Sequence, residues 1–471
     1  MKNGNINKPR LWAILALAVF LRAFLLLTAL HLSGIKAIFA ADSHGYIAPI
    51  QHLLHGSFAT DSGPELQRTP GYPIFLMLTG MVGNHPLLSD GCQILLAGFS
   101  VFLVFQIGIF LFHDERVAIL CAGLYAIEPL SILYGIELLS ECLFTTILLI
   151  FLFFFLKHLR ASTWSSLLYA ALALAATVYV RPASYYLPLC CAIGLAFIPP
   201  KVGVAPRLLR ALVFLIICSV LIGAWRVRNY VETGYSGFSS IADSNLYFFN
   251  AGEVLAQKQH TDFTTELGLL HWQDTPGYLA IHPEQVNWSI AQQLAYQRRM
   301  ALRTISENKL LYLKDHLRGM AVVLFHPCAT DYLWMLGESP LSSVTAFRSN
   351  ADKHGIIFTL WKTFWRFPLV FLGTAMLEVL LMAYYGLAIF GIPSLLQSKS
   401  LLITLALIFC YFVVIAGGAA GMARYRYPIM PIVALFAGAG IAKMLRLQLN
   451  AMPFPTLPQR CIDRAVDGIN C

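Results

Sequence analysis

Residues 11–32 read LWAILALAVFLRAFLLLTALHL, and residues 38–73 read IFAADSHGYIAPIQHLLHGSFATDSGPELQRTPGYP. The first stretch follows three basic residues and matches the roughly 20 apolar residues that a membrane span requires. No small-residue cleavage site is evident at its end, so we expect a retained first helix rather than a cleaved signal peptide. The second stretch is longer than the short polar turn that a connection between two helices needs. It places an acid, Asp42, directly beyond the membrane.

Composition indicates a membrane protein with several spans. Of the 471 residues, 58% are hydrophobic and 12% are charged, and the mean hydropathy is +0.67. Soluble domains contain about 25% charged residues, so most of this chain is expected to lie in a bilayer. The formal net charge of +9 would suggest a nucleic-acid partner in a soluble protein. Here basic residues at the cytoplasmic ends of spanning helices explain it, and we expect no nucleic-acid partner.

Further apolar runs predict a polytopic α-helical fold. They centre on about residues 92–112, 116–136, 138–157, 164–182, 184–200, 208–226, 367–391, 400–421 and 428–446. With the first run, they predict about ten transmembrane helices. We see neither internal repeats nor low-complexity segments.

The basic residues of the short loops predict the orientation. With the N-terminus in the cytoplasm, the inner connections contain Arg116, Lys157, Arg160, Lys201, Arg207, Arg210, Lys399, Lys443 and Arg446. This agrees with the positive-inside rule and makes both termini cytoplasmic. The long segment between the seventh and eighth runs exceeds the usual loop length, so we expect it to fold as an extracytoplasmic subdomain. The predicted divisions are a transmembrane region at 1–228 with a first outer loop at 33–90, the subdomain at 229–366, C-terminal transmembrane helices at 367–446 and a cytoplasmic tail at 447–471.

The first outer loop has helical spacing. Asp42 and Tyr46 are four residues apart, and Ile50 and Leu54 continue the pattern, so a helix is expected from about residue 43 to Gly56. Either Asp42 or Ser43 then simply caps this helix, or Asp42 is a general base above the membrane surface, and spacing does not separate the two. In the subdomain, spacing predicts one amphipathic helix over 284–305 and another through KLLYLKDHLRGMAVVLF, residues 309–325.

Ionisable residues gather on the outer side of this arrangement. They are Asp42, Glu137, Glu141, Arg181, Arg226, Arg228, Arg424 and Arg426. Such groups are costly at a bilayer edge unless they are paired, hydrated or functional, so we predict an outward-facing polar cavity. Glu141 lies about one turn into its span, whereas Glu137 is expected at the surface.

Five motifs, in order along the chain, resemble one family. The acid after the first span with LLHGSF and RTPGYPIFL is followed by LLSECLF at 138–144, VRPASYYLP at 180–188, WRVRNYVETGYSGFSS at 225–240 and ARYRYPIMP at 423–431. The set resembles the bacterial GT-C superfamily of integral membrane glycosyltransferases, of the protein-mannosyltransferase and aminoarabinose-transferase type. The resemblance extends over most of the chain but not to the outer subdomain.

The resemblance implies transfer of a sugar from a polyprenyl-phosphate carrier to an acceptor on the outer face of the bacterial inner membrane. The acid after the first span of such enzymes acts on the acceptor nucleophile, and Asp42 is the residue at that position. It would accept the acceptor's proton in a single, inverting displacement. The acceptor is expected to be a glycolipid, a polysaccharide or a protein, and the sugar and the carrier length stay open.

The donor's leaving group is a lipid phosphate, which arginine pairs with in a bidentate way. The candidates are Arg424 and Arg426 first, then Arg181 and Arg68, each with an alternative as an interfacial anchor or helix-end cation. Glu141 is a candidate for binding sugar hydroxyls or for pairing with an arginine. Tyr46 and Tyr72, within the shelf that ends at the Arg68–Pro73 turn, are expected to shape the substrate site.

Two matters stay open at this stage. No paired-acid or histidine motif predicts a metal site, although a divalent cation held by Asp42 and a second carboxylate is an alternative for phosphate chemistry. The rival function is a transporter or lipid flippase with an outward-facing polar cavity, and a third is a non-catalytic scaffold. Against a transporter, the chain has no repeated halves, and its charges cluster in one leaflet rather than at the midplane.

Overall fold

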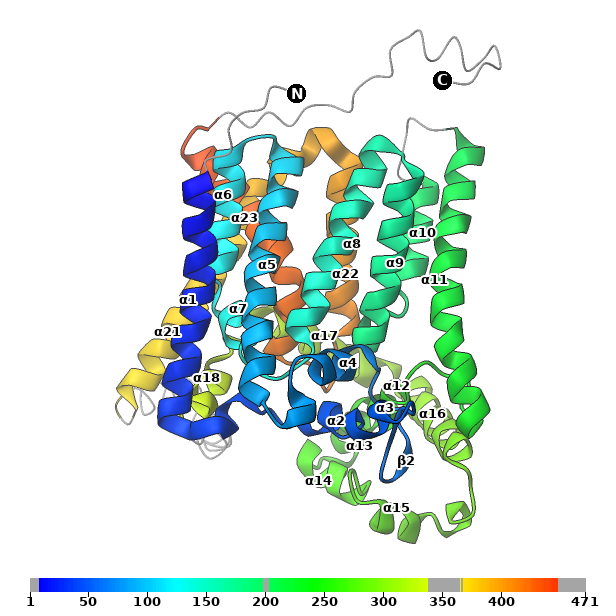
Figure 1. Ribbon diagram of the computed structural model, residues 1–471. Helices are drawn as coiled ribbons and strands as arrows, with labels where there is room; N and C mark the ends of the chain where they lie inside the picture. Colours follow the sequence, from blue (N-terminus) through cyan, green and yellow to red (C-terminus); the bar gives the residue numbers. More distant parts are fainter. Residues whose placement is uncertain (1–7, 198–202, 338–364, 366, 448–471) are drawn as a thin grey trace.

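The computed structural model describes residues 8–197, 203–337, 365 and 367–447, and the fold is a helix bundle with shorter helices covering one end (Figure 1). The bundle helices are α1 (Lys8–Ser33), α5 (Pro86–Phe112), α6 (Glu115–Ala126), α8 (Glu141–Ala161), α9 (Trp164–Val180), α10 (Leu187–Phe197), α11 (Val204–Thr233), α21 (Pro368–Gly391), α22 (Lys399–Ile415) and α23 (Met430–Met444). Within the described residues, six segments are long and apolar enough to cross a bilayer. They are Lys8–Ile38, Pro86–Phe112, Glu141–Ala161, Val204–Thr233, Pro368–Ile415 and Ala423–Met444. The chain therefore has the make-up of a helical membrane protein.

The difference from the expected ten spans arises at the shorter helices. The run expected at 116–136 is divided, because Glu128 and Pro129 begin a separate short helix, α7 (Pro129–Leu133). The Glu128 carboxylate accepts hydrogen bonds from the backbone N–H groups of Leu130 and Ser131, which caps α7 and ends the longer helix before it. Helices α9 and α10 have 17 and 11 residues, below the length of an untilted span. The number ten stays a prediction.

Helix α23 forms the centre of one half of the bundle, where it packs against α6 and α21. Small residues make this close packing feasible. A side chain at Gly438 would meet the backbone of Cys121, and one at Gly440 would meet the carbonyl oxygen of Leu387. Glycine therefore lets the helix backbones approach more closely than larger residues would allow.

The connection between α1 and α5 lies at the end of the bundle that carries the short helices (Figure 1). It contains η1 (Gly34–Ile38), α2 (Ser43–Ile47), α3 (Ile50–Leu54), the two-stranded hairpin β1 (Ala59–Thr60) and β2 (Gly63–Pro64), α4 (Gly71–Leu78) and η2 (Met81–Gly83). The predicted helix after Asp42 is present as two pieces that Pro49 separates. The second piece ends at Leu54, just before Gly56, whose φ of 78° lies in the left-handed region that favours glycine.

The segment after α11 folds beside this connection. Its elements are α12 (Ile241–Ser244), the π-helical η4 (Asn245–Ala251), α13 (Gly252–Gln259), α14 (Phe263–Leu269), α15 (Thr275–Ile281), η5 (Pro283–Gln285), α16 (Ile290–Glu307), α17 (Lys309–Phe325) and α18 (Ala329–Met335). A separate apolar cluster, which includes Tyr247, Phe248 and Tyr278, forms its core. The predicted helix through residues 309–325 is α17, and the predicted amphipathic helix is α16, which starts six residues later than expected.

The end of α11 joins this subdomain to the first connection. Arg228 Nη1 donates to the carbonyl oxygen of Glu65 at 3.0 Å, and Arg226 Nε donates to that of Ser236 at 2.8 Å. Asn229 Nδ2 donates to the carbonyl oxygens of Gly237 and Phe238. These side chains therefore position the subdomain against the loop that contains Asp42.

Two further short elements complete the bundle, η6 (Ile392–Ser398) between α21 and α22 and η7 (Ala423–Ile429) before α23. Helix α17 packs closely against the loop that precedes η7. A Cβ atom at Gly319 would lie 2.1 Å from the carbonyl oxygen of Gly418 and 2.3 Å from its nitrogen. Glycine is therefore needed at this crossing, and the crossing determines where η7 lies relative to the subdomain.

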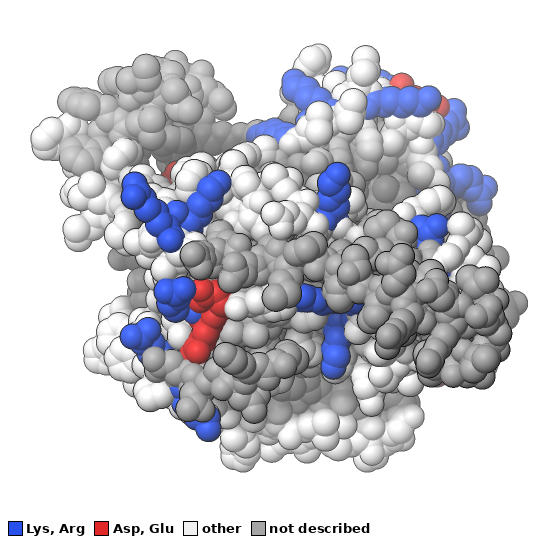
Figure 2. Space-filling view, turned by 90° about the horizontal axis from the view of Figure 1, so that it is seen from above, with Lys and Arg blue, Asp and Glu red and all other residues white. Residues whose placement is uncertain are grey.

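The opposite end of the bundle is basic. The helix ends there carry Lys8, Arg10, Arg116, Lys157, Arg160, Arg207, Arg210, Lys399, Lys443 and Arg446. Figure 2 looks onto this end and shows Lys and Arg side chains spread around the face, with Asp and Glu confined to small groups. We call it the basic end, and the other the subdomain end.

Candidate active site

Five charged side chains form a continuous chain of ion pairs at the subdomain end. Arg68 Nη2 lies 2.8 Å from Asp42 Oδ1, and Arg424 Nη2 lies 2.6 Å from Asp42 Oδ2. Arg424 also lies 3.0 Å from Glu141 through its Nε atom, and Arg181 pairs with the same Glu141 oxygen. We call these five residues the ion network. Three guanidinium groups and two carboxylates give it a formal charge of +1.

Widely separated parts of the sequence supply the network. Asp42 precedes α2, Arg68 precedes α4, Glu141 begins α8, Arg181 follows α9 and Arg424 lies in η7. The two loop residues are held in place by the RTPGYP turn. Thr69 Oγ1 donates to the carbonyl oxygen of Val180, and a side chain at Gly71 would meet the backbone of Tyr179, so the turn lies directly against the end of α9.

The side chain of Asp42 does not cap the helix that follows it. Asp42 occupies the N-cap position of α2, but its carboxylate makes no capping hydrogen bond and both of its oxygens bind arginine. Ser43 instead accepts from the backbone N–H of Ala40 and donates to the carbonyl oxygen of Leu138. The cap interpretation of Asp42 is therefore wrong.

Asp42 is the most accessible member of the network. Its side chain is 32% exposed, the three arginine side chains are 13–14% exposed, and Glu141 is 1% exposed. Burial opposes ionisation of Asp42, but the guanidinium groups of Arg424 and Arg68 hold its pKa well below the usual range. Asp42 is therefore an ionised carboxylate at neutral pH.

Several buried nitrogen and oxygen atoms of the network make no well-aligned hydrogen bond. Among the described residues, Arg68 Nε and Arg424 Nε are buried and have no aligned hydrogen-bond acceptor, although the latter lies close to Glu141. Both Glu141 oxygens likewise lack an aligned donor. Buried groups of this kind are costly unless a ligand or water satisfies them, so the network is suited to binding a polar ligand.

Two tyrosines lie beneath the loop side of the network. The guanidinium of Arg68 lies over the ring of Tyr46, 4.6 Å from its centroid, and the Tyr46 hydroxyl lies 3.0 Å from Ser140 Oγ. Tyr72 packs edge-on against Tyr46 at 5.0 Å and donates to Gln93 Oε1. Tyr72 is fully buried, so its contribution is to support Tyr46.

Of the four arginines predicted to bind phosphate, Arg426 is the one that the structure keeps apart from the network. It is buried, and its Nη1 atom donates to the carbonyl oxygens of Val323, Leu324 and His326 at 2.8–3.1 Å. These carbonyl groups end α17 and have no partner within the helix, so Arg426 caps it. Within η7, Arg424 therefore belongs to the ion network, whereas Arg426 caps α17.

A group of acids beside the network went unrecognised in the sequence. Glu137 was expected at the surface, but its side chain is only 3% exposed, and that expectation was wrong. Burial, with nearby Asp331 and Glu141, raises the Glu137 pKa to about 8, so it holds a proton at neutral pH. Tyr134 donates to Asp331 Oδ2 at 3.0 Å. Asp331 comes from the subdomain segment that matches no motif, so no sequence signal marked it.

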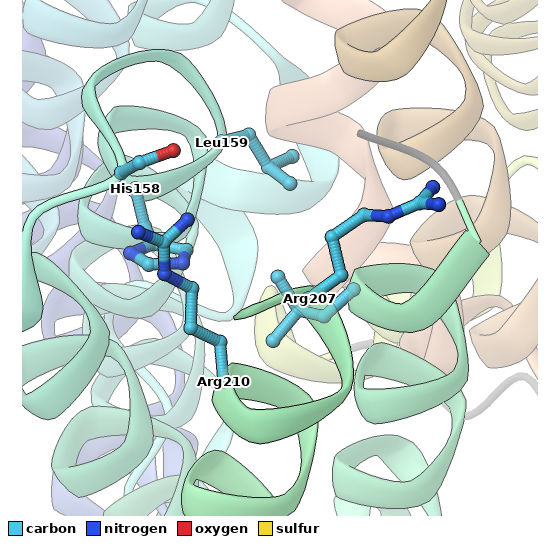
Figure 3. Close-up of a pocket in the computed structure, with 6 residues that line it drawn as sticks. His158, Leu159, Arg207 and Arg210 are labelled. Atoms are coloured by element: carbon cyan, nitrogen blue, oxygen red, sulfur yellow. The ribbon is translucent and has the colours of Figure 1, made fainter. Parts of the chain in front are cut away.

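A pocket at the opposite, basic end of the bundle is too small to hold a substrate. Figure 3 shows a pocket at the basic end, lined by His158, Leu159, Ser162, Leu195, Arg207 and Arg210. Its volume of about 10 Å³ is that of a single water site. Across the described residues, no group of three or more His, Cys, Asp or Glu side chains is arranged to hold a metal ion.

Comparison with known proteins does not identify the chain. No protein-family model matches it, and no curated protein matches it. The geometry of the site and the sequence motifs are therefore the basis for a functional proposal.

Proposed function

We propose that this protein is a glycosyltransferase that moves a sugar from a polyprenyl-phosphate carrier to an acceptor at the outer face of a bacterial inner membrane. The observation that carries the proposal is the ion network. It combines an accessible carboxylate with three guanidinium groups, of which Arg68 has a buried Nε donor without an acceptor among the described residues, at one end of a membrane-type helix bundle. The excess charge of +1 suits a ligand with one negative charge, such as a phosphodiester.

The orientation follows from the two ends of the bundle. Basic residues concentrate at the end opposite the network (Figure 2), which the positive-inside rule assigns to the cytoplasm. The ion network then faces the periplasm or the exterior, where a lipid-linked sugar would meet its acceptor.

The reaction is a single displacement. The acceptor hydroxyl oxygen forms a bond to the anomeric carbon while the bond from that carbon to the phosphate oxygen breaks. The hydroxyl proton passes to a carboxylate oxygen of Asp42, and the electron pair of the broken bond remains on the lipid phosphate. Arg424, Arg181 and Arg68 stabilise the negative charge that develops on that phosphate, and the configuration at the anomeric carbon inverts.

Because the pKa of Asp42 is low in the free protein, binding of the donor would also activate Asp42 as a base. While Arg68 and Arg424 both pair with it, Asp42 is a poor proton acceptor. A donor phosphate that takes over Arg424 removes one of these cations from Asp42 and frees its Oδ2 atom. The pKa of Asp42 then rises toward its ordinary value, so the base becomes active only when the donor is present.

The transporter alternative receives less support from the same contacts. A transport route needs polar groups near the middle of the bundle. Arg22, a fully buried arginine of α1, binds the carbonyl oxygens of Ala18 and Ala126 and the hydroxyl of Ser131. Its Nη1 and Nη2 atoms are thus committed to the protein's own backbone and side chains, and its Nε atom lacks a hydrogen-bond partner among the described residues.

The decisive experiment compares wild type with Asp42→Asn in membranes supplied with radiolabelled polyprenyl-phosphate sugars. We expect the variant to lose about 100- to 10,000-fold in transfer, the range for a general base. The matched control is Asp61→Asn, because Asp61 lies in the same loop, is fully exposed and pairs only with His52. Both variants must melt cooperatively. Transfer by Asp42→Asn at the wild-type rate would contradict the assigned base, and absence of transfer by wild type with every carrier sugar would contradict the proposed function.

A further inference from the structure

A second polar pocket lies in the subdomain, away from the ion network. It has a volume of about 470 Å³, within the range of small-ligand sites. Its lining residues come from α13, the start of α14 and α17, and they are Glu253, Ala256, Gln257, Thr261, Asp262, Phe263, Lys314, Asp315 and Arg318.

Asp315 marks this pocket as a binding site. Its side chain is 3% exposed, yet within the described chain its Oδ2 atom has no hydrogen-bond partner. Burial and the neighbouring Glu253 raise the pKa of Asp315 to about 6, while Arg318 opposes the rise. A buried carboxyl oxygen without a partner carries a free-energy cost that an occupant of the pocket would remove.

The charges on the walls restrict the class of occupant. The pocket walls carry both signs of charge, because α13 contributes Glu253 and α17 contributes Asp315 together with Lys314 and Arg318. A third acid, Asp262, is already engaged, since it caps α14 by accepting from the backbone N–H of Thr265. The remaining two acids and two cations favour neither an anion nor a cation. A divalent metal would need more oxygen ligands, and the described residues hold no cluster of three or more acidic, His or Cys side chains suited to one. A neutral ligand with many hydroxyl groups fits best, because each hydroxyl can donate to a carboxylate and accept from a cation.

The remaining residues agree with a saccharide. Gln257 offers an amide whose Nε2 is 3.0 Å from Glu253 Oε1, and Thr261 offers a hydroxyl. Phe263 provides an aromatic ring at the edge, held by packing against Phe249 with ring centroids 6.0 Å apart. An aromatic ring suits the apolar C–H face of a pyranose. We propose that this pocket binds a neutral saccharide, with Asp315 Oδ2 accepting a hydrogen bond from a sugar hydroxyl.

Helix α17 links this pocket to the ion network. The same helix carries Asp315, crosses the Gly418 loop at Gly319, and ends at the carbonyl groups that Arg426 binds from η7. Asp315 and Val323 are eight residues apart, or about 12 Å along the helix axis. A further step, which rests on the proposed function, is that the saccharide belongs to the acceptor.

The test measures binding without chemistry, on the full chain in lipid nanodiscs, because glucoside and maltoside detergents would compete for the pocket. The probes are glucose, galactose, mannose and N-acetylglucosamine with their disaccharides, titrated calorimetrically to about 20 mM, which covers millimolar dissociation constants. We expect at least one probe to bind with a stoichiometry of one. Asp315→Asn should raise its dissociation constant about tenfold or more, as expected for loss of a charge-assisted hydrogen bond.

Two further variants keep the test decisive. Lys314→Ala alters an exposed wall residue without touching the buried carboxyl, and it should weaken binding even if Asp315→Asn does not fold. Glu307→Gln is the matched control, because this exposed carboxylate pairs with Arg303 on α16 and does not line the pocket. Failure of every probe to bind, or equal binding by wild type and the pocket variants, would overturn the inference.

The outcome is separable from that of the proposed function. The Asp42→Asn variant should bind the saccharide like wild type although it does not transfer sugar. Binding without any transfer activity in wild type would support the pocket and count against the glycosyltransferase. Transfer by wild type without saccharide binding in nanodiscs would support the glycosyltransferase and count against the pocket.

Discussion

Arg424 and Arg426 are two residues apart in η7, yet they belong to two different kinds of buried charge. Arg424 binds the carboxylates of Asp42 and Glu141, whereas Arg426 binds three main-chain carbonyl groups at the end of α17. Arg22 is of the second kind, since it binds the carbonyl oxygens of Ala18 and Ala126.

The two kinds of arginine differ in whether they can exchange their protein partner for a ligand. A carbonyl group at a helix end has few other partners, so an arginine that binds it is needed to keep the helix end in place. An arginine paired with a carboxylate can exchange that carboxylate for a ligand phosphate, because one anion replaces another. Buried charges held by other side chains are therefore candidates for function, and those held by the main chain are candidates for stability.

The largest effect on stability is expected from Arg426→Leu. This substitution leaves the carbonyl oxygens of Val323, Leu324 and His326 without their donor. We expect the free energy of unfolding to fall by several kcal/mol, because each buried carbonyl group left without a donor costs about 1–3 kcal/mol. Thermal melting in lipid nanodiscs measures it. A melting temperature equal to that of wild type would show that Arg426 does not support α17.

The second prediction concerns Arg424, where substitution should affect sugar transfer more than stability. Arg424→Leu removes a guanidinium from the proposed phosphate site, so transfer should fall about 100- to 1,000-fold, as for loss of one transition-state donor. Arg424→Lys should restore only part of the activity, since lysine cannot bridge Asp42 and Glu141 as a fork. Steady-state transfer rates measure both. If Arg424→Leu lowered the melting temperature more than Arg426→Leu does, the assignment of Arg424 to function and Arg426 to stability would be wrong.

The crossing that carries η7 gives a third prediction. In Gly319→Ala the new methyl group would overlap the backbone of Gly418, which cannot move as a side chain could. Overpacking of this kind costs about 1–3 kcal/mol, and displacement of η7 should lower transfer as well. Melting and transfer are measured together. Gly223→Ala, at a helical glycine with open space around it, serves as the control and should change neither.

A smaller effect is expected at the support of the network. Tyr46→Phe removes the hydroxyl that lies 3.0 Å from Ser140 Oγ but keeps the ring beneath Arg68. The loss of one hydrogen bond should cost about 1 kcal/mol of stability. Tyr46→Leu, which also removes the ring, should reduce donor affinity further because the contact between cation and ring is lost. Equal donor affinity in the two variants would remove Tyr46 from the site.

The smallest expected effect is that of pH on the contribution of Asp42 to stability, which should not change between about pH 8 and pH 5. Although burial opposes ionisation, Arg424 and Arg68 lower the pKa of Asp42 in the folded protein below its unfolded value of about 3.9. The resulting stabilisation is complete above the unfolded pKa and is lost only as the pH falls through the folded pKa. The difference in melting temperature between wild type and Asp42→Asn should therefore stay constant from about pH 8 to pH 5 and shrink below about pH 4. A difference that disappears near neutral pH would contradict this electrostatic assignment.

Several parts of the site followed from local sequence. The helix after Asp42, its end just before Gly56 and the helix through residues 309–325 were predictable because backbone periodicity and glycine chemistry act over a few residues. The predicted topology placed Asp42, Glu141, Arg181 and Arg424 on one side of the membrane, and Arg68 was a candidate for phosphate binding. The structure joins these five in one network.

Other assignments required the three-dimensional contacts. Spacing did not distinguish the cap from the base at Asp42, because both place an acid at the start of a helix. The pairing of both carboxylate oxygens with Arg68 and Arg424 excluded the cap, and the role as a base stays a proposal. Glu137 was expected at the surface because its sequence neighbours place it near the membrane edge, but residues from the distant subdomain cover it. The saccharide pocket joins α13 and α17, which no motif connects.

The sequence by itself determined that this is a membrane-type helical protein, because hydropathy is a property of individual residues summed along the chain. Only the tertiary structure decided which of its charged residues pair with one another and which bind the main chain. Arg424 and Arg426 have the same chemistry and almost the same place in the sequence. They differ in the direction that η7 gives their side chains, and that direction depends on packing between helices far apart in the chain.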